Sequence, residues 1–262
     1  MSVIILRNEV VHYEVLGRGR PLIFLHGWVG SWRYWIPTMQ AVSVSYRTYA
    51  LDLWGFGDTA KAATYYSLDQ QVELLNEFLN EMGIMKIAII GHGLGAIIGL
   101  LYATHYREHV ERVLGVGLPH EEIAINPRLQ TASPMELVEW LLARNPDGDA
   151  ALLEASKADS KAISVSLTGI PKVNLPLLLT QTNVPYLLVH GLNDPVIKVP
   201  PPERVISLPE YAHHILFEES GHFPMLEEPS KFNRLLTDFL SLDSGESPRQ
   251  LQLKEEWKRR IR

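Results

Sequence analysis

The chain has 262 residues, of which 46% are hydrophobic and 21% are charged, a balance that suits one globular domain with a sizeable core. Its formal net charge is −6, with acidic and basic residues mixed along most of the chain, which argues against a nucleic-acid partner. There is no cysteine, which excludes disulfides, thiol catalysis and cysteine-based metal sites.

The N-terminal residues, Met1 to Val11, mix strand-like apolar residues with Arg7 and Glu9 and lack the basic, apolar and small-residue order of a secretion signal. The most apolar stretch, residues 87–103, is interrupted by His92 and several glycines and is shorter than the roughly 20 apolar residues that a spanning helix needs. We therefore expect no secretion signal and no membrane span, and a cytoplasmic location.

Short runs of aliphatic and β-branched residues alternate with helical patterns along the chain. Such runs are typical of central parallel strands that are covered on both faces. The predicted strands are residues 22–25, 49–51, 87–90, 113–116, 186–189 and 215–217.

Two helical patterns are clear. Apolar residues recur at steps of four and three from Leu68 to Met82, between a Ser67 cap and Gly83, and a second amphipathic helix follows Pro229. The segment 120–182 breaks the alternation and carries helical pieces punctuated by proline and glycine. We expect an α/β core of residues 1–119 and 183–242, a helical cap inserted at 120–182, and a polar C-terminal tail at 243–262 with a short helix.

The run from Ile87 to Ala96 reads Ile-Ala-Ile-Ile-Gly-His-Gly-Leu-Gly-Ala and predicts a strand, a tight turn and a helix. It matches the Gly-x-Ser-x-Gly nucleophile elbow except at its middle residue, which is Gly93. The flanking Gly91 and Gly95 keep the strained turn possible.

Other motifs stand in the order that this elbow requires. They are His26-Gly27-Trp28 after a strand, an Asp52-x-x-Gly-x-Gly turn, Asp194 just past a strand end, and His222 on the loop after the last strand. Together they make residues 22–240 resemble the α/β-hydrolase superfamily. The resemblance implies an α/β-hydrolase fold with a mostly parallel central sheet, helices on both faces and an inserted helical cap.

The resemblance also implies roles. The backbone N–H groups of Trp28 and Leu94 would form an oxyanion hole. Asp194 would accept the Nδ1 proton of His222, leaving Nε2 to take a proton from a nucleophile, which position 93 does not supply. The Asp52 turn would be structural.

Further residues are assigned by position. Trp28 and His92 are the candidate ligand-contacting residues, although neither His92 nor His26 is given a chemical role. The adjacent His213 and His214 would point to opposite faces of a strand and could not chelate one ion, so we predict no metal and no cofactor.

These features leave several functions open. The first is a non-catalytic or weakly active protein that binds a small apolar or acyl-type ligand, or a protein partner through the cap or the C-terminal tail. The second is a hydrolase or lyase in which Asp194 and His222 activate a water or act as a general base, without a covalent intermediate. The third is an engineered nucleophile knockout of a serine esterase.

Overall fold

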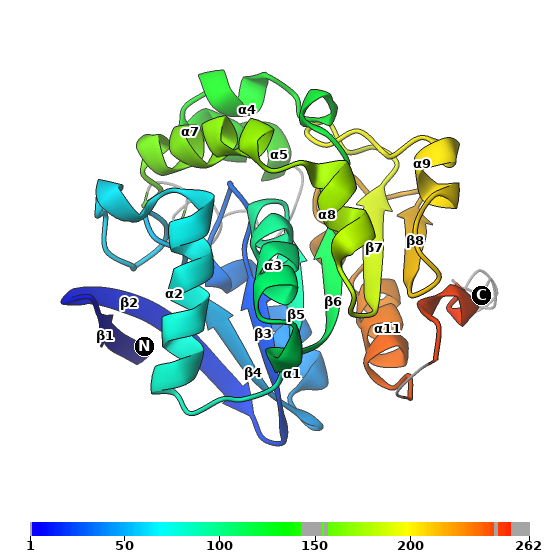
Figure 1. Ribbon diagram of the computed structural model, residues 1–262. Coiled ribbons are helices and arrows are strands. Elements are labelled where there is room, and N and C mark those ends of the chain that lie inside the picture. Colours follow the sequence, from blue (N-terminus) through cyan, green and yellow to red (C-terminus); the bar gives the residue numbers. More distant parts are fainter. Residues whose placement is uncertain (1, 143–153, 155–156, 244–245, 253–262) are drawn as a thin grey trace, which may run out of the picture.

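The computed structural model describes residues 2–142, 154, 157–243 and 246–252. Its centre is an eight-stranded sheet in the order β1-β2-β4-β3-β5-β6-β7-β8 (Figure 1). The strands are β1 Ser2–Leu6, β2 Glu9–Gly17, β3 Arg20–Leu25, β4 Tyr46–Leu51, β5 Ile87–His92, β6 Val110–Val116, β7 Tyr186–Gly191 and β8 Ala212–Phe217. The fold predicted from the sequence is confirmed.

One strand, β2, runs in the opposite direction to the other seven. β1 pairs with β2 and β2 with β4 in antiparallel register, whereas every other pair in the sheet is parallel. Arg7 and Asn8, both with positive φ, make the tight turn between β1 and β2. The six predicted strands correspond to β3 through β8, and several begin earlier than their apolar runs because polar residues continue the ladder.

Helices cover both faces of the sheet (Figure 1): α2, α3 and α8 lie on one face, and α1 and α11 on the other. The α-helices are α1 Ile36–Val42, α2 Leu68–Glu81, α3 Leu94–His105, α4 Arg128–Thr131, α5 Pro134–Leu142, α7 Ser160–Gly169, α8 Leu175–Gln181, α9 Pro202–Ile206, α10 Pro224–Glu227 and α11 Pro229–Leu240. Short 3-10 turns are η1 Trp32–Trp35, η2 Ala63–Tyr65, η3 Arg107–His109, η4 Glu122–Ala124, η5 Ile170–Lys172 and η6 Pro248–Gln250.

The two predicted amphipathic helices form as α2 and α11. In α2 the Ser67 hydroxyl accepts the backbone N–H of Gln70, the cap that the sequence predicts. In α11 the apolar residues from Phe232 to Leu240 are buried against the sheet. α3 is apolar on all sides and is buried along nearly its whole length between α2, α8 and the strands.

The segment predicted as a cap supplies helices of two kinds. α4, α5 and α7 lie across the carboxyl ends of the parallel strands, whereas α8 packs beside α3 on one face of the sheet (Figure 1). The division into core and cap remains a prediction. The predicted tail helix falls mainly on residues 253–262, outside the described residues.

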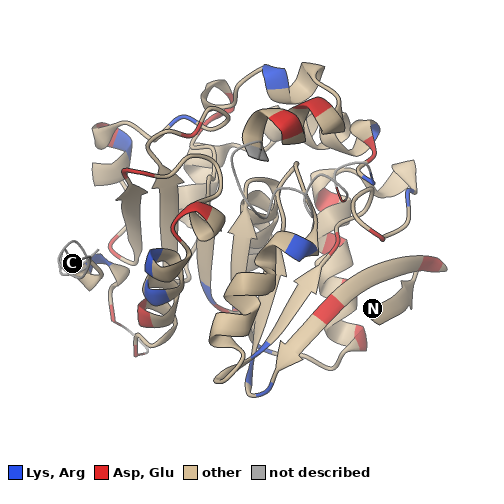
Figure 2. Ribbon diagram, turned by 180° about the vertical axis from the view of Figure 1, so that it is seen from behind, with Lys and Arg blue, Asp and Glu red and all other residues tan. Residues whose placement is uncertain are grey.

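Basic and acidic residues are interspersed over the described ribbon, with both signs on α11 (Figure 2). Within the part of the chain that the structure describes, no single helix is long and apolar enough to cross a membrane. One bent pair, Ser160–Lys172 with Leu175–Gln181, passes that test of length and composition only when its two helices are taken together.

Candidate active site

The predicted elbow joins β5 to α3 with Gly93 between them. Gly93 has φ 49° and ψ −108°, a conformation that side-chain-bearing residues rarely adopt. Its N–H donates to the Val116 carbonyl at 2.8 Å, and its own carbonyl accepts from Ala96 and Ile97 in the first turn of α3. The strained turn is therefore retained although no side chain stands on it.

The two flanking glycines are required by close backbone approach. A Cβ at Gly91 would lie 2.4 Å from the Gly95 carbonyl oxygen, and a Cβ at Gly95 would lie 2.4 Å from the Leu25 carbonyl oxygen. Both obstacles are main-chain atoms, which cannot turn aside as a side chain can. The expectation that these glycines allow strand and helix to approach is supported by this geometry.

The indole of Trp28 covers the elbow. A Cβ at position 93 would stand 3.1 Å from both Cε3 and Cζ3 of that ring. Trp28 is only 1% exposed, and its Nε1–H donates to the Ser166 hydroxyl of α7 at 3.0 Å, which in turn donates to the Ile163 carbonyl. The side chain that lies over the nucleophile position is thus fastened to a helix of the predicted cap.

The two predicted oxyanion-hole donors are the backbone N–H groups of Trp28, in the loop after β3, and Leu94, directly after Gly93. Leu94 is the first residue of α3, so its N–H has no partner within the helix. Among the described residues, neither the backbone N–H of Leu94 nor the backbone N–H of Trp28 donates to another group. Both amides remain available to an anionic oxygen, as such a site requires.

Asp194 and His222 meet as the sequence predicts. His222 Nδ1–H donates to Asp194 Oδ2 at 2.9 Å, and both side chains are almost completely buried. Burial by itself would raise the pKa of Asp194, but the His222 imidazole and the amides of Val196 and Ile197 outweigh it and lower that pKa. Asp194 is therefore a carboxylate, and its bond to Nδ1 fixes the orientation of the His222 ring.

The loop that carries His222 is braced by Glu227 of α10. The two oxygens of this carboxylate accept the N–H groups of Gly221 at 2.5 Å and Phe223 at 2.9 Å, the residues on either side of His222. Asp194 is held in a similar way, since its Oδ1 accepts from Val196 and Ile197. Asp194 and the loop around His222 are thus each positioned by hydrogen bonds between a carboxylate and nearby backbone N–H groups.

His92 connects three parts of the site from behind. Burial lowers its pKa well below the ordinary value, so the ring is neutral. Nε2–H donates to the His222 carbonyl at 3.0 Å, and Nδ1 accepts from the Tyr34 hydroxyl at 3.1 Å. Tyr34 in turn accepts the Gly27 N–H. Both ring nitrogens are thus used within the protein, and His92 is fully buried, as Trp28 is. Its contact with a ligand stays a prediction.

Comparison with known proteins decides the family. A sequence model of the alpha/beta hydrolase fold matches residues 20–161. The chain belongs to this family.

Individual relatives in this family are hydrolases and esterases. The chain is 27% identical over 254 residues to a 2-hydroxy-6-oxo-6-(2'-aminophenyl)hexa-2,4-dienoic acid hydrolase of Metapseudomonas resinovorans, covering 87% of each chain. It is 24% identical over 253 residues to a pimeloyl-[acyl-carrier protein] methyl ester esterase of Vibrio cholerae, covering 87% of this chain and 97% of that one.

Solved structures share the fold. A serine-to-glycine variant of the N-acyl homoserine lactonase AidH, complexed with N-hexanoyl homoserine lactone, superposes with a TM-score of 0.80 at 20% identity over 91% of this chain and 96% of that one. A serine-to-alanine variant of the meta-cleavage product hydrolase CumD of Pseudomonas fluorescens, complexed with acetates, gives 0.77 at 23% identity over 92% and 97%.

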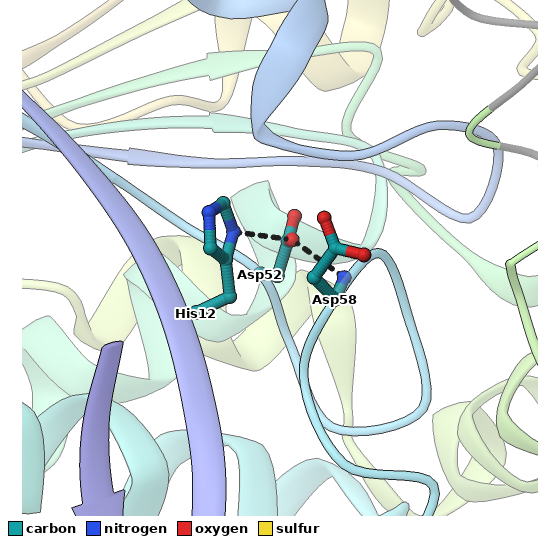
Figure 3. A group of neighbouring side chains, drawn as sticks. All are labelled: His12, Asp52 and Asp58. Atoms are coloured by element: carbon teal, nitrogen blue, oxygen red, sulfur yellow. Dashed lines mark hydrogen bonds and ion pairs between the residues drawn. The ribbon is translucent and has the colours of Figure 1, made fainter. Parts of the chain in front are cut away.

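This member of the alpha/beta hydrolase fold family also contains a buried cluster in its Asp52 turn. His12 Nδ1–H donates to Asp52 Oδ2 at 2.8 Å, and the same oxygen accepts the N–H of Asp58 (Figure 3). One potential ligand atom from each of His12, Asp52 and Asp58 lies within 4.8 Å of the others. A cation there would displace the His12 proton and compete with Lys157, which is ion-paired to Asp58 at 2.9 Å. We therefore assign the cluster a structural role.

The remaining histidines lie apart from the site. His213 Nε2–H donates to the Leu251 carbonyl, whereas His214 Nε2–H donates to His190 Nδ1 at 3.1 Å. The neighbours thus face different partners, as their alternation in a strand predicts. His26 bonds to the Gly27 carbonyl and the Leu53 N–H, which ties the oxyanion loop to the Asp52 turn.

Sequence reasoning missed three supporting residues: Tyr34, Ser166 and Glu227. Tyr34 and Ser166 carry no motif, because their partners lie 58 and 138 positions away in the chain. Glu227 had a local signal. It is the last residue of the proline-initiated, single-turn helix α10 (Pro224–Glu227), from which its carboxylate reaches the free N–H groups that precede the helix.

Proposed function

We propose that this member of the alpha/beta hydrolase fold family binds a small, mainly apolar acyl-type ligand at the Gly93 site and forms no acyl-enzyme. The observation that carries the proposal is the pairing of Gly93 with Trp28. The elbow keeps its strained turn without offering an oxygen, and the indole fills space next to the position from which a side chain would project.

Two further features support binding. The free amides of Trp28 and Leu94 remain suited to a ligand carbonyl oxygen. The AidH relative in fold, itself a serine-to-glycine variant, is complexed with an N-acyl lactone. A cytoplasmic location and a protein partner for the cap or the C-terminal tail remain predictions.

Turnover of p-nitrophenyl esters of several chain lengths tests the proposal. We expect no hydrolysis by the unmodified protein, and a gain of activity in Gly93→Ser that disappears when His222→Ala is added. A fluorophosphonate probe should label Gly93→Ser and leave the present protein unlabelled. Labelling of the present protein would mean that the nucleophile lies elsewhere.

The Gly93→Ser variant needs a companion, because its Cβ would press on the Trp28 ring. Trp28→Phe removes the benzo edge of that ring, so the double variant Gly93→Ser with Trp28→Phe should gain at least as much activity as Gly93→Ser alone. Trp28→Phe on its own is the matched control and should stay inactive.

A second function is favoured by the intact Asp194–His222 pair. His222 Nε2 would deprotonate a water above Gly93, and the water oxygen would attack an ester or thioester carbonyl whose oxygen accepts from the Trp28 and Leu94 amides. The acyl C–O or C–S bond then breaks, and the His222 imidazolium returns the proton to the leaving alcohol or thiol, which leaves a carboxylic acid as the other product. In serine proteases, loss of a triad member leaves roughly 10³ to 10⁴-fold acceleration over water. Turnover by the unmodified protein that disappears in His222→Ala would establish this function and refute the inert binder.

The third possibility, deliberate replacement of a serine, makes the same prediction for Gly93→Ser. It differs in stability. An original serine would fit beside the Trp28 ring, so Gly93→Ser would then lose only the stability that backbone strain costs, about 1 kcal/mol, with no further loss from crowding.

A further inference from the structure

A ligand-sized cavity lies beside the site rather than over Gly93. Its volume is about 640 Å³, within the range of small-molecule sites. Three segments line it: residues 122–130 around η4 and α4, Leu167 of α7, and residues 195–198, which follow Asp194. None of Gly93, Trp28, Leu94 and His222 lines it, so this cavity is additional to the oxyanion site.

The walls of the cavity are preformed. The Asn126 N–H donates to the Val196 carbonyl at 2.8 Å, and the Lys198 N–H donates to the Ala124 carbonyl at 2.9 Å, which makes a short antiparallel ladder between two loops. The Asn126 side-chain amide adds a bond to the Pro195 carbonyl, and its Oδ1 accepts the Arg128 N–H. Because these loops are already held in place, a ligand would bind without paying much conformational entropy to order them.

The lining is apolar apart from a few polar side chains. Ile125, Leu167 and Val196 form apolar surface inside, and Ile123 stands at the mouth with 75% of its surface exposed. An apolar chain that covered this exposed isoleucine would remove apolar surface from water, which is favourable. These residues suit the hydrocarbon part of an amphipathic molecule.

Lys198 supplies a cation for the polar end of such an amphipathic molecule. Nearby cations are engaged, since Arg204 bonds to Glu121 and Arg128 stacks over the Trp140 ring. Lys198 has no ion pair within the described residues, and it belongs to the ladder that forms the wall.

Glu122, the other charge in the lining, begins η4 next to the exposed Ile123. A carboxylate in the lining would repel a second negative charge on a ligand. With one exposed residue of each sign in the lining, Lys198 and Glu122, the cavity therefore favours a ligand with a single anionic group over one with two.

We propose that this cavity binds a monocarboxylate with a medium-length apolar chain, its carboxylate on Lys198 and its chain against Ile125, Leu167 and Val196. The site adjoins the acid of the pair, because the Val196 and Ile197 N–H groups that hold Asp194 Oδ1 belong to the same wall. A bound chain against Val196 stabilises the segment that positions Asp194.

Octanoate is the probe, compared with acetate, octanol and octylamine by calorimetry and by NMR shifts of backbone amides. Octanoate should bind at least tenfold more tightly than the other three compounds and should shift amides of residues 124–126 and 195–198. Because the protein is acidic overall, non-specific attraction of an anion is disfavoured.

The variants separate a built site from general apolar binding. Lys198→Met should weaken octanoate binding by about tenfold or more, and Lys198→Arg should retain it. Glu122→Gln should leave it unchanged or tighten it. Lys172→Met, which removes an exposed lysine outside the cavity, is the matched control and should have no effect.

Unchanged affinity in Lys198→Met, preferential binding of octylamine, or shifts confined to other regions would overturn the proposal. These readouts are independent of ester turnover. The failure of this inference and the failure of the proposed function are therefore distinguishable.

Discussion

The benzo edge of the Trp28 indole lies so close to Gly93 that a Cβ at position 93 would stand 3.1 Å from two ring carbons. In the sequence, Trp28 and Gly93 belong to two separate motifs, the loop after β3 and the elbow, and the fold brings the two residues into contact. Together with the φ of 49° at Gly93, it makes a side chain at this position costly for two independent reasons, backbone strain and crowding.

Gly93→Ala should therefore lower the free energy of unfolding by about 2 to 3 kcal/mol, measured by urea denaturation. Gly83 is the matched control, because it also has a positive φ, of 65°, but a Cβ there would meet nothing within 4 Å. Gly83→Ala should cost only about 1 kcal/mol, the strain alone. An equal or smaller loss in Gly93→Ala would show that the ring does not crowd this position.

The link between Trp28 and α7 makes a second prediction. Ser166→Ala removes the acceptor of a buried indole N–H, which should cost about 1 to 3 kcal/mol of unfolding free energy. In a Trp28→Phe background the same change should cost clearly less, since no indole N–H remains to be satisfied. Thr168→Val, which removes an exposed hydroxyl on the same helix, is the control and should change stability by less than about 0.5 kcal/mol. Equal losses in both backgrounds would exclude the Trp28–Ser166 bond as the cause.

Much of this fold could be predicted from the sequence because its signals are local. Apolar runs gave the positions of β3 to β8, and the Gly91-x-Gly93-x-Gly95 spacing gave the turn between β5 and α3. The pairing of Asp194 with His222 was predictable because each follows a strand end, and the carboxyl ends of neighbouring parallel strands lie at one edge of the sheet.

The remainder depends on contacts between distant residues. Nothing near Trp28 in the chain indicates that Ser166 holds its indole, and nothing near His92 indicates that Tyr34 and the His222 carbonyl use both of its nitrogens. The burial of the His92 ring and the use of both its nitrogens within the protein therefore could not be predicted from the sequence.

The buried pair of His12 and Asp52 predicts a dependence of stability on pH. Burial would lower the pKa of His12, but its bond to Asp52 and the surrounding carboxylates raise that pKa above 6.5. Because the pKa of His12 is higher in the folded protein than in the unfolded chain, the stability that His12 contributes is complete below pH 6.5 and is lost as the pH rises through the folded pKa. Burial would raise the pKa of Asp52, but His12 and other contacts lower it below 3.8, so its contribution is lost only in acid.

His12→Gln should accordingly lower the unfolding free energy by about 3 kcal/mol at pH 6 and by less at pH 9. Urea denaturation across this range measures the difference between the two proteins at each pH. A difference that is constant from pH 6 to pH 9 would mean that His12 is neutral in the folded protein.

His190 and His214 should oppose folding in acid instead. Burial lowers the pKa of His190 to about 4 and that of His214 to about 3, while His190 Nε2–H donates to the Leu118 carbonyl and its Nδ1 accepts from His214. The unfolded chain takes up these protons near pH 6.5, so stability falls as the pH drops below that value, by about 3 kcal/mol for His190 by pH 4.

His190→Gln should be less stable than the parent at pH 7 yet lose less stability on acidification. His105→Gln, at an exposed histidine, should leave the acid slope unchanged. If the parent and His190→Gln lost stability in parallel between pH 7 and pH 4, the buried imidazoles would not be the groups that titrate.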